Sequence, residues 1–255
     1  MSVVWTLAGA YVVYAIMMVW LHPRFIYPFL QEDQPIAGFS RVSLPGGDGT
    51  PISLQVAAGE GPVLLYFMGN AGALWAFEPG LRQHLQAGRH VVALEYRGGG
   101  GRPGTPSESL LKADALKALD YARSFGKPVV VQGFSMGSGL AMHVAAHHDI
   151  DAMILEAPYS RMCRIMADRS FLPACRLPFV QTWDSLALAK DVSAPVLILH
   201  GAEDAIIQPK YSEALDRALP NARRSVIPGA THADLAAFPT VIEAIERWIS
   251  APGTP

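Results

Sequence analysis

The sequence predicts a doubly wound α/β domain with a mostly parallel sheet, and three observations support this. Short apolar runs alternate with segments of helical character along most of the chain. Most of these runs are continuously apolar, as in strands that helices cover on both faces. The first two runs are separated by Pro45-Gly46-Gly47-Asp48-Gly49, a strong turn signal, which indicates an N-terminal hairpin.

The expected elements follow one another in order along the chain. The strands are Phe39–Leu44, Ile52–Val56, Val63–Phe67, His90–Glu95, Pro128–Gln132, Ala152–Glu156, Pro195–His200 and, more weakly, Ser225–Ile227. The helices are Ser107–Arg123, Met136–His148, Tyr211–Leu219 and Thr240–Ile249. The first helix has the clearest start, a capping box with Thr105 as N-cap, Pro106 at N1 and Glu108 at N3. This alternation of strand and helix is typical of a parallel sheet.

Composition and charge narrow the class of protein. Of the 255 residues, 51% are apolar and 16% charged, so the chain can bury a sizeable core and is not disordered. The net charge is −2 and the basic residues are scattered, so no nucleic-acid partner is predicted. Cys163 and Cys175 do not form a disulfide framework. They either pair in an oxidising compartment or are buried as small apolar side chains.

The N-terminal segment is the most informative feature of the composition. Val3 to Leu21 carries no charge and has Trp5 and Trp20 near its ends. At about 1.5 Å per residue, such a helix matches the thickness of a bilayer core. We interpret residues 1–24 as a single transmembrane anchor. A signal peptide would have basic residues before the apolar run, and a buried core helix is the other alternative. Arg24 follows the run, which favours the body on the cytoplasmic side without settling it.

The rest of the chain is expected to be one folded domain, residues 25–250, with a short tail at 251–255. One segment breaks the rhythm of strands and helices. Residues 159–183 lie between two expected strands and mix Arg, Met, Cys, Phe and Pro without clean periodicity. We interpret this segment as a lid insertion over the active site.

A nucleophile motif lies where an apolar strand meets a helical segment. Gly133-Phe134-Ser135-Met136-Gly137 is a Gly-x-Ser-x-Gly sequence in the strand-turn-helix context of a nucleophile elbow. Its glycines leave room for a close backbone approach, and the turn exposes the Ser135 hydroxyl at a helix N-terminus. Ser135 is therefore the predicted nucleophile.

A base and an orienting carboxylate follow in the order expected for this fold. His232 lies in a loop after the last strand, where a general base comes last in the chain. Asp204 lies just past a buried strand, where it can accept the imidazole N–H and stabilise the imidazolium. Glu203 and Glu156 are the alternative carboxylates, and His200 is expected to be structural.

The tetrahedral intermediate needs hydrogen-bond donors. The backbone N–H groups of Met136, directly after the nucleophile, and of Asn70, in the loop after Val63–Phe67, are the expected oxyanion hole. No metal site is predicted. His143 and His147 are four residues apart on a helix, but no Glu follows His143 as in the zinc-protease motif.

Taken together in this order, the motifs resemble the α/β-hydrolase superfamily. They are most similar to its small membrane-anchored serine hydrolases, which have one N-terminal transmembrane helix. That branch has a His-Gly-Asn-x-Gly loop, a Tyr-Arg-Gly-x-Gly loop, Gly-x-Ser-x-Gly, His-Gly-x-x-Asp and a late His. The matching segments here are Gly69–Gly72, Tyr96–Gly98, Gly133–Gly137, His200–Asp204 and His232. Met68 departs from the usual histidine, which bears on the shape of the oxyanion loop but not on its N–H donors.

The resemblance implies an α/β-hydrolase fold and hydrolysis of an acyl bond through an acyl-serine intermediate, without a cofactor. A small-molecule or lipid carboxylester is the leading substrate. A thioesterase that deacylates protein cysteines and a serine peptidase remain alternatives, because acyl specificity depends on pocket shape. A catalytically silent membrane-bound interaction module is the alternative outside enzymes, and it would predict a broken triad.

Overall fold

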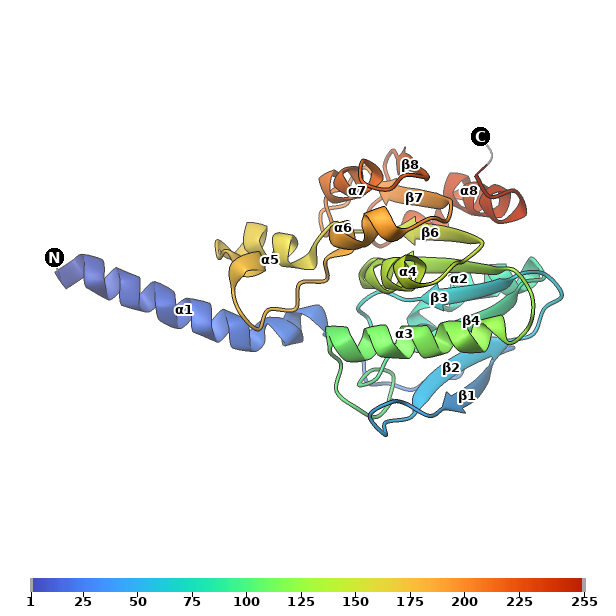
Figure 1. Ribbon diagram of the computed structural model, residues 1–255, viewed down its shortest axis with the longest axis horizontal. Helices are drawn as coiled ribbons and strands as arrows, with labels where there is room; N and C mark the ends of the chain where they lie inside the picture. The colour runs from blue at the N-terminus through green and yellow to red at the C-terminus, as the bar shows by residue number, and fades with distance from the viewer. Residues whose placement is uncertain (1, 254–255) are drawn as a thin grey trace.

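One mixed sheet of eight strands forms the centre of the molecule, shown in Figure 1 as a computed structural model that describes residues 2–253. The strands are β1 (Ser40–Leu44), β2 (Ile52–Ala57), β3 (Val63–Phe67), β4 (His90–Glu95), β5 (Val129–Phe134), β6 (Ala152–Glu156), β7 (Val196–Gly201) and β8 (Ala222–Ile227). Their order is β1-β2-β4-β3-β5-β6-β7-β8. The β1–β2 and β2–β4 pairs are antiparallel and the others parallel, which confirms the predicted sheet with its N-terminal hairpin.

Helices cover both faces of this sheet. The α-helices are α1 (Ser2–Ile26), α2 (Glu78–Gln86), α3 (Glu108–Arg123), α4 (Met136–His147), α5 (Met162–Ser170), α6 (Ser185–Leu188), α7 (Pro209–Asp216) and α8 (Pro239–Ser250). In Figure 1, α3 and α4 pack side by side on one face. The chain passes from β3 through α2 to β4 in one direction along the sheet, and from β4 through α3 to β5 and from β5 through α4 to β6 in the other. Because such crossovers are right-handed, α2 lies on the face opposite to α3 and α4. An ion pair of Arg89, just after α2, with Glu246 joins α8 to that side.

The strand order creates a switch point in the middle of the sheet. From β3 the chain crosses to β4, whereas from β5 it crosses the other way to β6. Connections leaving neighbouring strands in opposite directions open a crevice at their carboxyl ends, where α/β proteins bind ligands. The loop after β3 and the turn after β5 therefore meet at the edge of this crevice.

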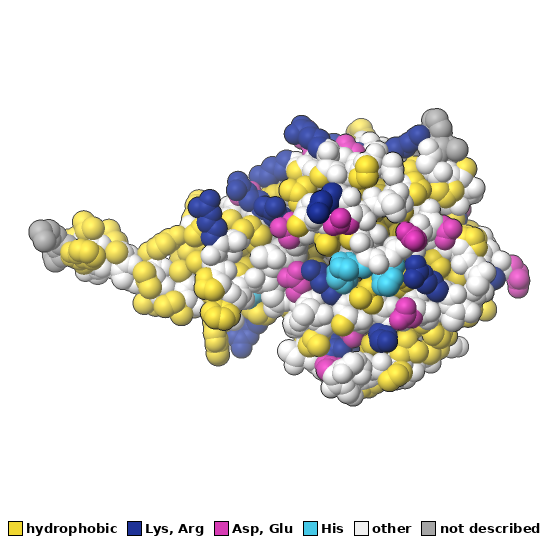
Figure 2. Space-filling view, viewed as in Figure 1, with side chains coloured by type: hydrophobic (Ala, Val, Ile, Leu, Met, Phe, Trp, Pro, Cys, Tyr) yellow, Lys and Arg dark blue, Asp and Glu magenta, His cyan; other side chains and the backbone are white. Residues whose placement is uncertain are grey.

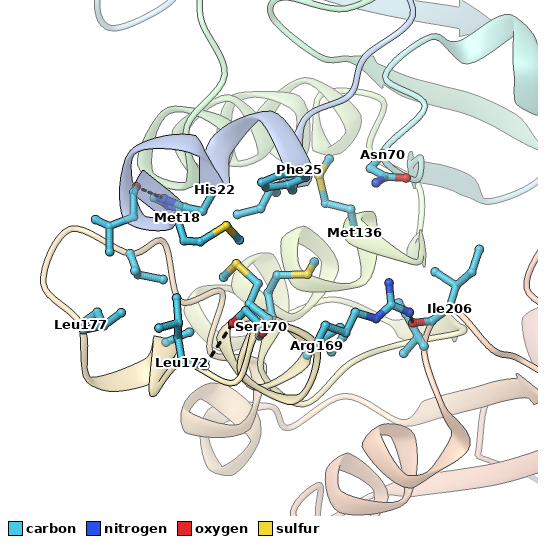
Figure 3. A pocket seen from close by; sticks show the side chains of 18 of the residues that line it. Met18, His22, Phe25, Asn70, Met136, Arg169, Ser170, Leu172, Leu177 and Ile206 are labelled. Atoms are coloured by element: carbon cyan, nitrogen blue, oxygen red, sulfur yellow. Dashed lines mark hydrogen bonds between the residues drawn. The ribbon is translucent and has the colours of Figure 1, made fainter. Parts of the chain in front are cut away.

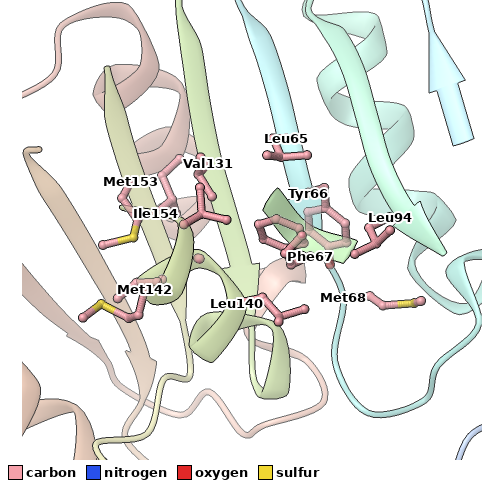
Figure 4. Close-up of a cluster of buried hydrophobic side chains, with 14 of the residues drawn as sticks. Leu65, Tyr66, Phe67, Met68, Leu94, Val131, Leu140, Met142, Met153 and Ile154 are labelled. Carbon is pink, nitrogen blue, oxygen red and sulfur yellow. The ribbon is translucent and has the colours of Figure 1, made fainter. Parts of the chain in front are cut away.

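The core beneath the crevice is continuous and apolar. Every residue of β3, β4 and β6 is buried, as expected for central strands covered on both faces. Side chains of β3, β5 and β6 pack with those of α4, and Figure 4 shows Phe67, Val131, Leu140 and Ile154 among them. This packing fixes the strands whose ends carry the candidate site.

The start of α3 differs from the predicted capping box. The N-cap is Ser107 and not Thr105, and the Ser107 hydroxyl accepts a hydrogen bond from the backbone N–H of Leu110. The carboxylate of Glu108 does not turn back to Thr105. Instead it pairs with Lys112 and accepts the backbone N–H of Trp183, at the end of the predicted lid, 3.0 Å away. The observed helix start therefore coincides with a tertiary contact that the local sequence does not reveal.

Helix α1 projects from the body along the long axis of the molecule (Figure 1). Residues Val3–Ile26 are long and apolar enough to cross a membrane. The helix continues past the expected anchor, residues 1–24, through Pro23 to Ile26. Pro23 has no N–H to donate to the carbonyl of Val19, but the Nδ1 of His22 lies 2.6 Å from that oxygen and donates to it instead. The side chain of His22 thus replaces the missing backbone bond.

The predicted lid, residues 159–183, contains α5 and a short 3₁₀ turn, Ala174–Arg176. Cys163 of α5 forms a disulfide with Cys175 of this turn. The pairing that the sequence left open is therefore present in the structure, and it closes the lid on itself.

Candidate active site

Three elements carry the predicted triad to the carboxyl edge of the sheet. Ser135 directly follows β5, Asp204 lies in the loop after β7, and His232 lies in the loop between β8 and α8. Parallel strands end at the same edge, so residues that are far apart in sequence meet there. The hairpin and the two long helices α3 and α4 contribute none of these side chains.

The turn at Ser135 has the strained geometry of a nucleophile elbow. Ser135 has φ 50° and ψ −116°, an uncommon conformation for a residue with a side chain. A Cβ on Gly137 would lie 2.1 Å from the carbonyl oxygen of Phe67, and one on Gly133 would lie 2.5 Å from that of Gly137. Both glycines are therefore required by close backbone approach. The turn holds Ser135 at the N-terminus of α4.

The three side chains form one hydrogen-bonded chain. His232 Nε2 lies 2.9 Å from Ser135 Oγ, and His232 Nδ1 lies 2.7 Å from Asp204 Oδ2. In the neutral imidazole, Nδ1 donates to the carboxylate and Nε2 accepts the serine hydroxyl. The serine and the aspartate are buried, and 11% of the His232 side chain is exposed. This arrangement can remove the serine proton as the hydroxyl attacks.

Asp204 is held as a carboxylate by the donors around it. Burial alone would raise its pKa, but hydrogen bonds from His200 and His232 and the backbone N–H of Ile207 lower the pKa below its usual range. Oδ1 accepts the N–H groups of Ile206 and Ile207 at 2.8 and 2.7 Å, which leaves Oδ2 for His232. The carboxylate is thereby aimed at the imidazole.

The alternative carboxylates lie elsewhere. Glu203 is exposed and does not reach the imidazole. Glu156 is buried beside β5, accepts a hydrogen bond from Gln132 at 2.6 Å, and has its pKa raised by burial. His200, expected to be structural, is buried next to Asp204. Its Nε2 donates to the carbonyl of Ile207 at 2.7 Å and lies 3.4 Å from Asp204 Oδ2.

The two predicted oxyanion donors border the same cavity as the nucleophile. Met136 is the first residue of α4, so its backbone N–H has no partner within the helix. Asn70 lies in the exposed turn after β3 and lines the cavity together with Ser135 and Met136. Met68, which departs from the histidine expected from the resemblance, is fully buried, and its carbonyl accepts a hydrogen bond from the hydroxyl of Tyr96 at 2.6 Å.

A largely apolar cavity of about 360 Å³ opens beside Ser135. Figure 3 shows its walls: Met18, His22 and Phe25 come from α1, and Leu172 and Arg169 come from the predicted lid. The sequence did not predict that α1 lines this cavity. A signal was present, since Tyr14 in the apolar run and His22 directly after it, two polar residues eight positions apart, lie on the same helix face.

No group of three side chains that would hold a metal ion occurs among residues 2–253. The rings of His143 and His147 contact each other on one face of α4, with centroids 4.3 Å apart and planes tilted by 48°.

Comparison with known proteins identifies several groups of relatives. The model of the dienelactone hydrolase family matches residues 102–244. The protein Rv2307c of Mycobacterium tuberculosis is 30% identical to this chain over 92% of its length and 90% of the length of Rv2307c. Human protein ABHD12B is 32% identical over 64% of this chain and 53% of its own. The lysophosphatidylserine lipase ABHD12 of Rattus norvegicus is 33% identical over 59% of this chain.

The match to the rat lipase spans 43% of that protein, so more than half of its length has no counterpart in the match.

Among solved structures, the esterase Pf2001 of Pyrococcus furiosus superposes with a TM-score of 0.67 over 88% of this chain and 97% of its own, at 16% identity. The esterase RhEst1 of a Rhodococcus species gives 0.66 over 84% and 99%, at 17% identity. These superpositions establish the predicted α/β-hydrolase fold.

Proposed function

Because this chain belongs to the dienelactone hydrolase family of the α/β-hydrolase superfamily, we propose that it is a serine esterase anchored to a membrane. Membership makes it a hydrolase of ester bonds. The proposal assigns Ser135 as nucleophile, His232 as general base and Asp204 as the carboxylate that orients the base. It assigns the backbone N–H groups of Met136 and Asn70 to the oxyanion hole.

The observation that carries this proposal is the geometry of His232. Its two ring nitrogens lie within hydrogen-bond distance of Ser135 Oγ and Asp204 Oδ2, at 2.9 and 2.7 Å. A base that is oriented on one side and placed against a hydroxyl on the other is the arrangement that activates serine.

The reaction follows from these positions. Ser135 Oγ attacks the carbonyl carbon of the ester while His232 Nε2 takes the hydroxyl proton. The oxyanion that forms lies at the start of α4, where backbone N–H groups and the helix dipole favour negative charge. His232 then gives the proton to the departing alcohol, which leaves an acyl-serine. A water, deprotonated by His232, releases the acid and restores Ser135.

Two observations favour a lipid ester as the substrate. The cavity beside Ser135 is lined mainly by apolar side chains, and a relative covering part of the chain is named a lysophosphatidylserine lipase. The exposed apolar helix α1 supports a single-pass membrane location, in which residues 1–24 act as the anchor of the hydrolase domain at 25–250.

The test is covalent labelling followed by turnover. We expect a fluorophosphonate probe to modify Ser135, and Ser135→Ala to abolish both labelling and ester hydrolysis while leaving the folded state intact. Ser124→Ala, at the end of α3 and far from the cavity, is the matched control and should keep both.

A panel of p-nitrophenyl esters of rising chain length, with acyl thioesters and peptides alongside, then identifies the bond that is cleaved. An esterase should prefer the oxygen esters. Full activity in Ser135→Ala would exclude the nucleophile assignment, and a folded wild-type chain that hydrolyses nothing in the panel would favour the interaction module.

A further inference from the structure

We propose that helix α1 forms one wall of the acyl-binding site, and that the substrate is a bilayer-resident lipid ester whose acyl chain enters sideways between α1 and the lid, residues 159–183. This rests on the proposed esterase function. It adds that the lipid ester is taken from the bilayer, and it adds the direction from which the acyl chain arrives.

The shape of the cavity is the first argument. One face of α1 lines it, since Tyr14, Met18, His22 and Ile26 recur every four residues along the helix. This stripe covers about 18 Å at the helical rise of 1.5 Å per residue. Lid residues form the facing wall, and Figure 3 shows Leu172 and Ser170 there. An elongated apolar space that begins at Ser135 fits an acyl chain better than a polar acyl group.

The lid is fastened to α1 at its tip, in the middle of the segment, and near its C-terminal end. Near the tip of the lid, the hydroxyl of Tyr14 donates to the carbonyl of Ser170 at 3.0 Å, and that of Tyr11 donates to the carbonyl of Phe171 at 3.2 Å. At the other end, the backbone N–H of Gln181 donates to His22 Nε2 at 3.1 Å. The helix and the lid therefore form one unit around the cavity.

The position of these contacts along α1 limits how the helix and the lid can insert into a membrane. On the N-terminal side of Tyr11, Ser2–Ala10 of α1 extends past the contacts with the lid, which is about 14 Å of helix against a bilayer core of about 30 Å. This part is too short to cross a bilayer alone. Any deep insertion of α1 therefore takes the tip of the lid into the bilayer as well.

The surface of the lid agrees with such immersion. Phe171 and Phe179 are 88% and 89% exposed, although aromatic side chains of this size are normally buried. Arg164, Arg169 and Arg176 are exposed on the same segment, and Figure 2 shows basic side chains gathered beside the base of the projecting helix. Aromatic side chains favour the membrane interface, and basic ones favour anionic headgroups. The cavity between α1 and the lid would then open to lipid.

Two neighbouring methionines of α1 provide a matched test. Met18 lines the cavity, whereas Met17 is exposed on another face of the helix. We expect Met18→Trp to fill the space for the acyl chain and to lower the ratio of activity on a palmitoyl ester in phosphatidylcholine vesicles to activity on a soluble butyryl ester by about tenfold. Met17→Trp should leave this ratio at its wild-type value.

Equal ratios in both variants, whether lowered or unchanged, would contradict the proposal. Helix α1 would then attach the protein to the membrane without forming part of the acyl-binding site. Labelling of Ser135 by the fluorophosphonate and hydrolysis of the butyryl ester by the wild-type chain test the esterase function separately. If both fail, the proposed function is wrong; if both hold but the two methionines behave alike, only the role of α1 is wrong.

A second measurement needs no variant. A long-chain alkyl fluorophosphonate with a photoreactive diazirine at the end of its chain phosphonylates Ser135 in the full-length protein in vesicles, and light then joins the chain end to its neighbours. We expect crosslinked peptides from α1, between Tyr14 and Ile26, and from the lid. Crosslinks confined to other parts of the body would overturn the proposal.

Discussion

At the scale of single residues, the candidate site depends on contacts that tolerate no added atoms. The elbow places Ser135 at a positive φ, and the backbone of Gly137 lies against the carbonyl of Phe67 at the end of β3. A conformation of this kind persists only where the surrounding structure enforces it. The close approach of these two backbones therefore provides the enforcement.

Gly137→Ala should consequently disrupt the elbow. The new Cβ would lie 2.1 Å from a backbone oxygen, so β3 and α4 must separate. We expect a loss of stability of about 1–3 kcal/mol, as for other overpacked cores, and loss of fluorophosphonate labelling. Gly80→Ala is the control, because its Cβ meets nothing within 4 Å in a helix where alanine is favoured. A Gly137→Ala variant as stable and as reactive as wild type would contradict the close approach.

Asp204 should make acid stability depend on pH. Its folded-state pKa lies below the value of about 3.9 for an unfolded chain, so it contributes stability above about pH 4 and loses it as the pH falls further. Asp204→Asn should be less stable than wild type at neutral pH, and the difference in melting temperature should shrink between about pH 5 and about pH 2.

Thermal unfolding monitored by circular dichroism across this range gives the comparison. Glu203→Gln removes an exposed carboxylate next to Asp204 and should follow the wild-type curve. A difference between wild type and Asp204→Asn that stays constant down to about pH 2 would mean that Asp204 has no lowered pKa.

The residues of the candidate site could largely be predicted, because each follows a recognisable strand in a fixed order. Ser135, Asp204 and His232 were predicted in this way, and the structure places His232 within hydrogen-bond distance of the other two. The contact of His200 with Asp204 could not be found, since it depends on how the loop after β7 folds back. Sequence order does not carry that information.

At the scale of elements, buried strands were easier to predict than helix ends. The continuous apolar runs located β3 to β7 closely and the turn signal located β1 and β2, whereas β8 begins three residues before the expected Ser225. Helix α2 was missed because it is short, has Pro79 and Gly80 in its first turn and buries only Leu81 and His84. Helix α7 begins at Pro209 and not at Tyr211. Such boundaries depend on local contacts more than on periodicity.

The disulfide should be the main covalent stabiliser of the lid, residues 159–183. Cys163 and Cys175 are 12 residues apart, and closing a loop of that size stabilises the folded state by about 3 kcal/mol in the chain-entropy account. We expect Cys163→Ser/Cys175→Ser to lower the melting temperature and to speed proteolysis within residues 159–183.

A reductant applied to wild type should reproduce this effect and should leave the double variant unchanged. If the reductant destabilises both proteins equally, the disulfide is not the cause.

At the scale of the whole molecule, the arrangement of α1 raises the question of how the protein sits in a membrane. Val3 to Val13 are exposed, although the hydroxyl of Tyr11 already bonds to the lid, and from Tyr14 onward half-buried and buried residues alternate with exposed ones. Placing a charge on the exposed part costs about 2.5–3.5 kcal/mol at a bilayer centre. We expect Val12→Lys to shift the protein out of the membrane pellet after an alkaline carbonate wash.

Ser43→Lys, on the exposed edge strand β1, controls for the added charge and should stay in the pellet. Retention of Val12→Lys to the wild-type extent would show that α1 is not the anchor.

Two features bear on which side of the membrane the body lies, and they point to opposite sides. Arg24 after the apolar run favoured the cytoplasm, whereas a disulfide between Cys163 and Cys175 forms in oxidising compartments. We give more weight to the disulfide, because one arginine is a weak topology signal, and we expect the body on the exoplasmic side. A membrane-impermeant protease should then cleave the body in intact cells, and full protection would place it in the cytoplasm.

Because α1 forms one wall of the cavity, the activity of this enzyme should also depend on the detergent used to extract it from the membrane. Detergents are single-chain amphiphiles, and a micelle surrounding α1 would hold their tails beside the same opening that we assign to lipid. The detergent that solubilises the protein would then compete with the lipid substrate for the cavity, and its inhibition of the enzyme should increase with the length of the detergent tail. Rates measured in nanodiscs would exceed those in micelles for that reason alone.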